Sequence, residues 1–80
     1  MNSNHKIAAA MVAAGYTIQT ELGKRSALIA YDKDGDTAAI ARFLSGRFTG
    51  GCTVDRMGHV TSHDTVTGLI ESIERYGKAA

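Results

Sequence analysis

The sequence has little of several features that mark particular classes of protein. Its single cysteine, Cys52, rules out an intramolecular disulfide framework and suits a reducing, cytoplasmic setting. No apolar stretch approaches the roughly 20 residues needed to span a bilayer. The apolar segment 7–14 follows Lys6, but five of its eight residues are alanine, so we expect no signal peptide there.

Charge and aromatic residues are also sparse. The formal net charge is +1, which gives no strong attraction to nucleic acid or to an anionic membrane, so any basic surface must be local. Three tyrosines, two phenylalanines and no tryptophan leave few platforms on which bases could stack. The glycine-rich segment 46–51, GRFTGG, lacks the Lys-Ser/Thr of a phosphate-binding loop.

The composition that remains is typical of a small globular domain. The chain has 80 residues, of which 44% are apolar and 21% charged, without any low-complexity tract. A chain of this length buries only about 60% of the surface that its unfolded form exposes. We therefore expect one domain over residues 1–80, with a small core and a frayed tail at 78–80.

Three segments are predicted to be helices. The first covers 4–14 and ends at Gly15, a residue suited to positive φ. The second covers 36–46, with Asp36 as its N-cap and Ile40, Phe43 and Leu44 as its buried stripe. The third ends at Gly77 and has apolar residues at i, i+3, i+4 and i+7 spacing: Val66, Leu69, Ile70, Ile73 and Tyr76.

Two hairpins are predicted between these helices. In the first, a two-residue turn at Gly23-Lys24 places Ile18 opposite Ile29 and leaves Leu28 exposed on the outer face. In the second, residues 50–62 form two short strands around the turn 56–58, and Val54 faces Val60.

The predicted fold is therefore a single α+β domain in the order α-ββ-α-ββ-α. Its helices are expected mainly on one face of an antiparallel four-stranded sheet. Asp-Thr pairs at 36–37 and 64–65 each precede a predicted helix, which would fit a ββα unit used twice. Independent selection of good helix caps explains the two pairs equally well.

Candidate catalytic and metal-binding groups are few. The segment DKDGD, residues 32–36, has Thr37 and Phe43 where a calcium loop needs glycine and glutamate, so we expect a turn. The only cluster of such groups is Cys52, His59, His63 and Asp64. It offers one cysteine and two histidines, fewer than the four cysteine or histidine ligands that a structural zinc site normally needs. We expect Cys52 to point inward with Val54, and we predict no catalytic residues, no metal and no cofactor.

Binding by surface is the function that these observations favour. One face of the predicted sheet lies open to solvent, with a mixed set of side chains: Thr17, Gln19, Glu21, Ser26, Leu28, Thr53, Asp55, His59 and Thr61. Leu28 would supply apolar area and the arginines charged donors, a combination that interface anchors favour. The predicted partner-binding residues are Lys24, Arg25, Leu28, Arg56 and His59.

In its size and its lack of catalytic motifs, the whole chain resembles the small phage-encoded inhibitors that include anti-CRISPR proteins. The resemblance is one of build and transfers no residue role. It implies a stoichiometric binder that occludes a nucleic-acid-handling complex, with Arg25 or Arg56 competing with phosphate for the target. Two alternatives stay open, a weak nucleic-acid-binding module and a small Cys/His enzyme, and the sequence also leaves a homodimer open.

Overall fold

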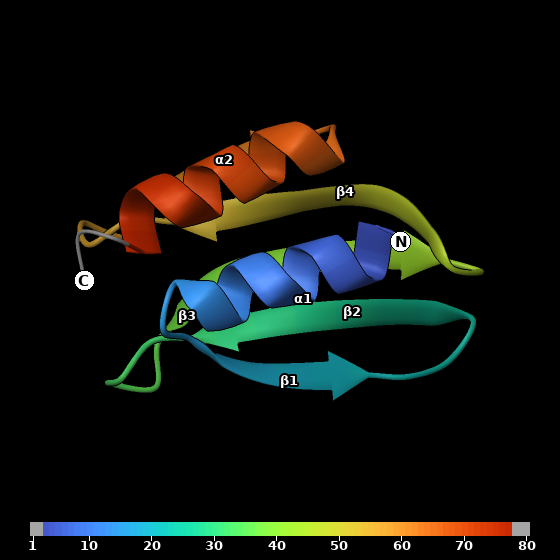
Figure 1. The fold of residues 1–80 in the computed structure, drawn as a ribbon, viewed down its shortest axis with the longest axis horizontal. Coiled ribbons are helices and arrows are strands. Elements are labelled where there is room, and N and C mark those ends of the chain that lie inside the picture. The colour runs from blue at the N-terminus through green and yellow to red at the C-terminus, as the bar shows by residue number, and fades with distance from the viewer. Residues whose placement is uncertain (1–2, 78–80) are drawn as a thin grey trace.

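The chain forms two helices and five strands in the computed structural model, which describes residues 3–77 (Figure 1). The elements are α1 (Ser3–Ala13), β1 (Thr17–Glu21), β2 (Arg25–Tyr31), β3 (Thr37–Leu44), β4 (Arg47–Val54), β5 (Val60–His63) and α2 (Val66–Gly77). The α+β class is confirmed, whereas the predicted count of four strands and the middle helix are wrong. The tail predicted at 78–80 lies outside the described residues.

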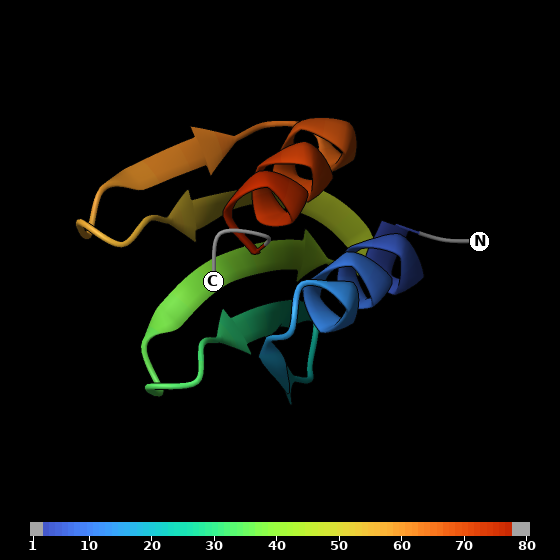
Figure 2. The ribbon, with the colours of Figure 1, turned by 60° about the vertical axis from the view of Figure 1, so that its left-hand side comes forward.

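The five strands form one antiparallel sheet in which neighbours in sequence are neighbours in space, in the order β1-β2-β3-β4-β5. Both helices pack on the same face of this sheet (Figure 2). Helix α1 lies over β1 and β2, α2 lies over β4 and β5, and the two helices contact each other. The prediction that helices cover mainly one face is confirmed, and the opposite face has no covering element among residues 3–77.

Strand β3 occupies the segment that was predicted as a helix from 36 to 46. Its residues alternate, because Ala39, Ala41 and Phe43 join the core beneath the helices while Arg42 and Leu44 are exposed. The predicted helical stripe draws on the same few apolar residues, so spacing alone did not separate the two structures. A two-residue turn at Ser45-Gly46 decides in favour of a strand, since both residues have positive φ, as the hairpin turn of type I′ requires.

The register between β1 and β2 differs by one residue from the predicted one. Ile18 lies opposite Ala30, and Gln19 lies opposite Ile29, because the connection spans three residues rather than two. A slip of one residue exchanges the two faces of a strand. Leu28 is consequently buried, with 4% of its surface exposed, whereas Leu22 in the connection is 87% exposed. Both faces of β2 are apolar, so the sequence pattern did not reveal the error.

One end of each helix is capped by the residues around it. Gly15 has a φ of 91°, Gly15 N donates to Val12 O at 3.0 Å, and Tyr16 N donates to Met11 O at 3.1 Å. These are the two bonds of a Schellman motif, so the predicted end of the first helix at Gly15 is confirmed. Helix α2 is capped by Thr65, whose Oγ1 accepts from Gly68 N at 3.0 Å.

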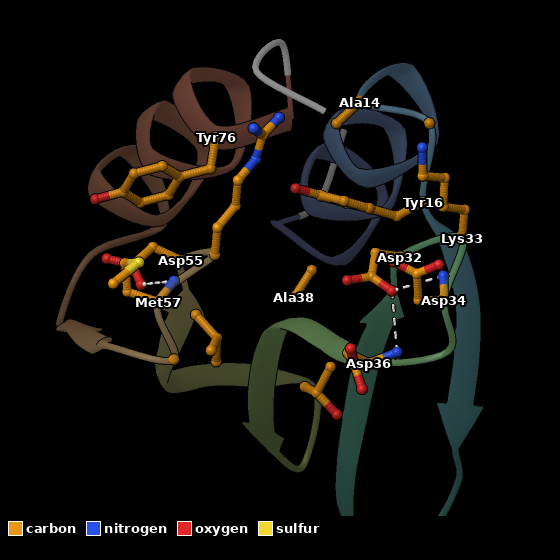
Figure 3. Close-up of a pocket in the computed structure, with 15 residues that line it drawn as sticks. Ala14, Tyr16, Asp32, Lys33, Asp34, Asp36, Ala38, Asp55, Met57 and Tyr76 are labelled. Atoms are coloured by element: carbon orange, nitrogen blue, oxygen red, sulfur yellow. Dashed lines mark hydrogen bonds between the residues drawn. The ribbon is translucent and has the colours of Figure 1, made fainter.

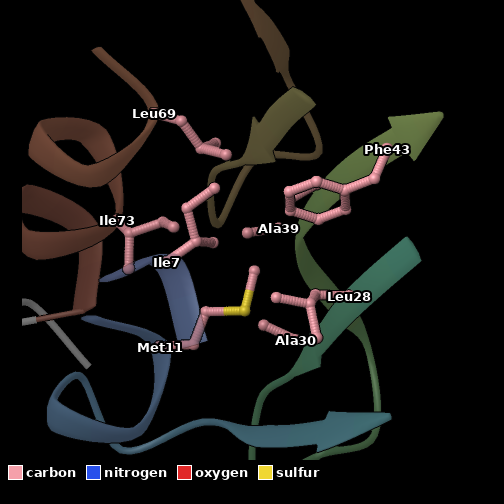
Figure 4. Packing of buried hydrophobic residues seen from close by; sticks show 9 residues of the cluster. Ile7, Met11, Leu28, Ala30, Ala39, Phe43, Leu69 and Ile73 are labelled. Carbon is pink, nitrogen blue, oxygen red and sulfur yellow. The ribbon is translucent and has the colours of Figure 1, made fainter. Parts of the chain in front are cut away.

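The core lies between the helices and the sheet (Figure 4). Its largest fully buried side chains include Ile7 and Met11 of α1 and Leu69 and Ile73 of α2. Leu69 of α2 packs closely against Gly51 of β4. A Cβ there would lie 2.6 Å from the carbonyl oxygen of Ile40 and 2.9 Å from Cδ2 of Leu69. Small residues on the sheet therefore set how closely the helices pack.

The loops β2–β3 and β4–β5 are built alike. In 32–36 and 55–59, the first residue is aspartate and the fourth is glycine with a φ of 85° or 82°. Asp55 Oδ1 accepts from Met57 N and His59 N at 2.9 Å each, and Asp32 Oδ1 accepts from the equivalent N–H groups at 2.9 and 3.0 Å. The expected turn at 32–36 is confirmed, but the Asp-Thr repeat is not, because Asp36-Thr37 leads into a strand and Asp64-Thr65 into a helix.

Replacing Asp55 is expected to destabilise the fold through this loop. The change Asp55→Ala removes the acceptor of two backbone N–H groups, so we expect a loss of about 1–3 kcal/mol in the free energy of unfolding. Asp34→Ala is the matched control, because the exposed Asp34 side chain accepts no hydrogen bond within residues 3–77, and it should change stability by less than about 0.5 kcal/mol. Urea unfolding measures both, and equal midpoints for the two variants would contradict the role assigned to Asp55.

Candidate binding surface

The five residues predicted to bind a partner do not form one surface. Lys24 and Arg25 are exposed at the β1–β2 end of the sheet, while Arg56 and His59 are exposed in the β4–β5 loop at the opposite end. Leu28 lies in the core cluster and contributes no apolar area to any surface. The prediction that Leu28 is exposed is wrong, and Leu28→Asp would test the stability of the core rather than partner binding.

The sequence cluster of cysteine and histidine is dispersed in the structure. His59 is 79% exposed in its loop and lies 3.6 Å from the carboxylate of Asp55. Cys52 is buried, but the prediction that it points inward is wrong, because Cys52 and Val54 lie on the uncovered face of the sheet. His63 lies on the other face, since alternate residues of β4 face opposite ways. Among residues 3–77, no three histidine, cysteine or acidic side chains come together as metal ligands.

A buried polar network that the sequence did not reveal joins β4, β5 and α2. Thr53 Oγ1 lies 2.8 Å from Ser72 Oγ and 3.2 Å from His63 Nε2, and Thr53 is 1% exposed. A hydroxyl beside a histidine is the arrangement of an activated nucleophile, but a substrate cannot reach an oxygen that is so deeply covered. The network instead satisfies polar groups beneath α2, and within residues 3–77 no buried side-chain nitrogen or oxygen lacks a partner.

The uncovered face of the sheet is predominantly aliphatic at its centre. Ile29 and Ile40 lie opposite each other on β2 and β3, and neither belongs to the core cluster on the helix side. Cys52 follows Ile40 in the same row, and Tyr31 and Val54 lie nearer the β2–β3 and β4–β5 loops. All but the buried Cys52 are only half-buried. We call this set of side chains the central patch: Ala27, Ile29, Tyr31, Ile40, Cys52 and Val54.

Arginines border the central patch at one end. By register, Arg25 and Arg47 flank Leu44, and Arg42 lies one row closer to the patch. All three are exposed, Leu44 is 41% exposed, and none of the three forms an ion pair with another described residue. We call these three residues the arginine cluster. Its side chains lie on the same face as Ile29 and Ile40, because residues two positions apart on a strand share a face.

Aspartates gather at the other end of the sheet, where the two similar loops flank a cleft of about 1020 Å³ between the ends of the helices. Figure 3 shows Tyr16 and Tyr76 on opposite sides of this cleft, with Asp32 beside the first and Asp55 below the second. Burial, and then the negative charge of Asp32, raise the pKa of the Tyr16 hydroxyl, while Arg56 opposes the shift. Tyr16 therefore keeps its proton at neutral pH and is no candidate base.

Sequence reasoning missed the central patch because it placed the wrong side of β2 in the core and assigned β3 to a helix. Gly68 lies in the first turn of α2. A Cβ on Gly68 would lie 3.0 Å from Oγ1 of Thr65, so the helix cap itself explains this glycine. The turn residues at 32–36 and 45–46 bound a segment in which inward and outward side chains alternate. This combination is the signal that could have revealed β3 and its outward side chains.

Comparison with known protein families, curated proteins and solved structures gives no match. Within residues 3–77, neither helix is long and apolar enough to cross a membrane.

Proposed function

We propose that this protein is a non-catalytic protein-binding module whose binding surface is the uncovered face of its sheet. The observation that supports this most directly is the central patch, where Ile29 and Ile40 are only half-buried although they occupy inner strands of the sheet. Contiguous apolar area on a soluble domain marks an interaction site, and flanking arginines are enriched in such sites.

The residues of the surface also favour protein over nucleic acid as the ligand. Tyr31 is the one aromatic side chain of the central patch, whereas sequence-tolerant binding of single strands relies on several stacked bases. The arginine cluster is the feature that favours the alternative, because unpaired guanidinium groups bind phosphate. A stoichiometric inhibitor of a nucleic-acid-handling complex, which the resemblance in build implies, is the narrower form of the proposal.

Capture by immobilised protein tests the proposal. Ile29→Thr/Ile40→Thr keeps β-branched residues in the strands but removes apolar area from the face, and Val12→Thr is the control on the exposed side of α1. Proteins retained by the wild type and the control should be retained at least about tenfold less by the double variant, the equivalent of about 1.4 kcal/mol. Circular dichroism verifies that all three are folded.

Identical retention by all three proteins would contradict the proposal. Retention of an oligonucleotide that falls steeply with salt, and that disappears in Arg25→Glu/Arg42→Glu, would favour the nucleic-acid alternative instead. For the narrower form, a captured complex should lose its nucleic-acid-dependent activity at one equivalent of the wild type and retain it with the double variant.

A further inference from the structure

The central patch is three strands wide and has polar side chains on both sides. On β1, the residues that share its face are Thr17, Gln19 and Glu21. On β5, Ser62 lies beside Cys52, while Val60 lies beside Val54 and adds apolar area at one end. A second sheet stacked on this face would bury the polar side chains of β1, whereas an element three strands wide would cover the central patch alone.

One α-helix has the dimensions of this patch. The outer two of three adjacent strands are about 10 Å apart, and a helix with its side chains is about 10–12 Å in diameter. Strand β2, from Arg25 to Tyr31, is about 20 Å long, the length of a helix of about 14 residues. A helix with apolar residues at i, i+3, i+4 and i+7 spacing presents a continuous apolar face to such a surface.

The charge on the strands is positive and lies at one end. The five strands contain three arginines, those of the arginine cluster, and one acidic residue, Glu21, so their net charge is +2 with His63 neutral. None of the three arginines forms an ion pair within residues 3–77. Arg25 and Arg47 flank Leu44, which places their α-carbons about 10 Å apart, about the diameter of a helix. Carboxylates at the end of a helix lying along β3 can therefore pair with both.

We infer that the uncovered face binds one amphipathic helix of a partner protein, whose apolar side chains cover the central patch and whose carboxylates pair with the arginine cluster. The inference rests on the proposed function, because it requires this face to bind protein. The patch supplies the apolar area of the interface. The arginine cluster selects the charge of the partner, since a helix with basic residues at this end would meet like charge.

Selection from a library of helical peptides tests the charge of the partner. The displayed peptides have about 14 residues, leucine at i, i+3, i+4 and i+7 positions, and glutamate, glutamine or lysine at the polar positions of both ends. Peptides selected on the immobilised wild type should carry glutamate at one end and exclude lysine there. A selection that yields no binder, or binders without a preference for glutamate at either end, overturns the inference.

A double-mutant cycle then tests where the carboxylates bind. A selected peptide, made synthetically with blocked ends, should bind Arg42→Gln/Arg47→Gln at least about tenfold more weakly than the wild type. The same peptide with its end glutamates replaced by glutamine should bind both proteins equally. The control is Lys6→Gln/Arg75→Gln, which removes as much charge from exposed positions of α1 and α2 and should bind like the wild type. Equal weakening by the control would show a general effect of charge and overturn the assignment to the arginine cluster.

Methyl signals in nuclear magnetic resonance identify the face that the peptide covers. Those of Ile29 and Ile40 should shift on binding, whereas those of Ile7 and Ile73 in the core should not. The reverse pattern overturns the inference.

Other occupants of the face would give different results. An oligonucleotide that binds the wild type and Ile29→Thr/Ile40→Thr equally, but not Arg42→Gln/Arg47→Gln, would replace the helix by nucleic acid. A homodimer that dissociates in Ile29→Thr/Ile40→Thr would assign the face to a second copy. A wild type that selects no acidic helix but captures a different protein through Ile29 and Ile40 would refute the helix and leave the proposed function standing.

Discussion

Gly51→Ala is expected to destabilise this protein by about 3 kcal/mol or more, the upper end of the range for overpacked interiors. The added methyl group would lie 2.6 Å from the backbone oxygen of Ile40, which cannot move without disturbing the β3–β4 pairing. A domain of 80 residues has a total free energy of unfolding of only about 4–12 kcal/mol, so a large share of the stability would be lost.

Urea unfolding of Gly51→Ala, with Gly58→Ala as the control, measures this effect. A Cβ on Gly58 meets no atom within 4 Å, so its cost comes from a φ of 82° alone and should be about 1 kcal/mol. Adding Leu69→Ala to Gly51→Ala should cost less than the sum of the single changes, because one of the two clashes is with Leu69. Strict additivity would show that α2 does not approach β4 at this position.

Ile73→Ala is expected to cost about 2–5 kcal/mol, whereas the same substitution at Ile70 should cost clearly less. Ile73 is 1% exposed in the centre of the core, while the neighbouring Ile70 is half-buried at its margin. The pair compares identical chemistry on one helix, so helix propensity cancels and burial remains. Thermal and urea unfolding measure both variants, and equal losses would mean that α2 is rotated about its axis relative to the structure described here.

The sequence predicted helices where one face was clearly apolar. Helix α2 was located from its spacing, and Leu69 and Ile73 are buried as that spacing requires. Helix α1 was bounded by Gly15, whose positive φ few other residues adopt. The facing of Val54 and Val60 was also predicted correctly, because the loop between them contains a glycine at the position that needs it.

Strand β3 and the faces of β2 could not be assigned in the same way. Alanine is the best helix former, yet Ala39 and Ala41 are in a strand, because pairing of β3 with β2 and β4 and burial beneath the helices override the local preference. Which face of β2 enters the core depends on whether the β1–β2 connection has two or three residues. The side chains do not decide it, since Leu28 and Ile29 are both suited to a core. This error in the face of β2 also made the predicted binding surface wrong, because Leu28 was placed on the outer face and Ile29 in the core.

The helices that close the core are the first and the last elements described, and this order constrains how the chain can fold. Each strand of the meander pairs with the one before it, so hairpins can form from contacts that are short in sequence, which favours rapid folding. Ile7, however, is buried against a core completed by Ile73. During synthesis the sheet can assemble early, but α1 lacks its neighbouring helix until the ribosome has released α2. Until α2 docks, both faces of the sheet remain incompletely covered, and a chain without its docked α2 is the form most exposed to aggregation.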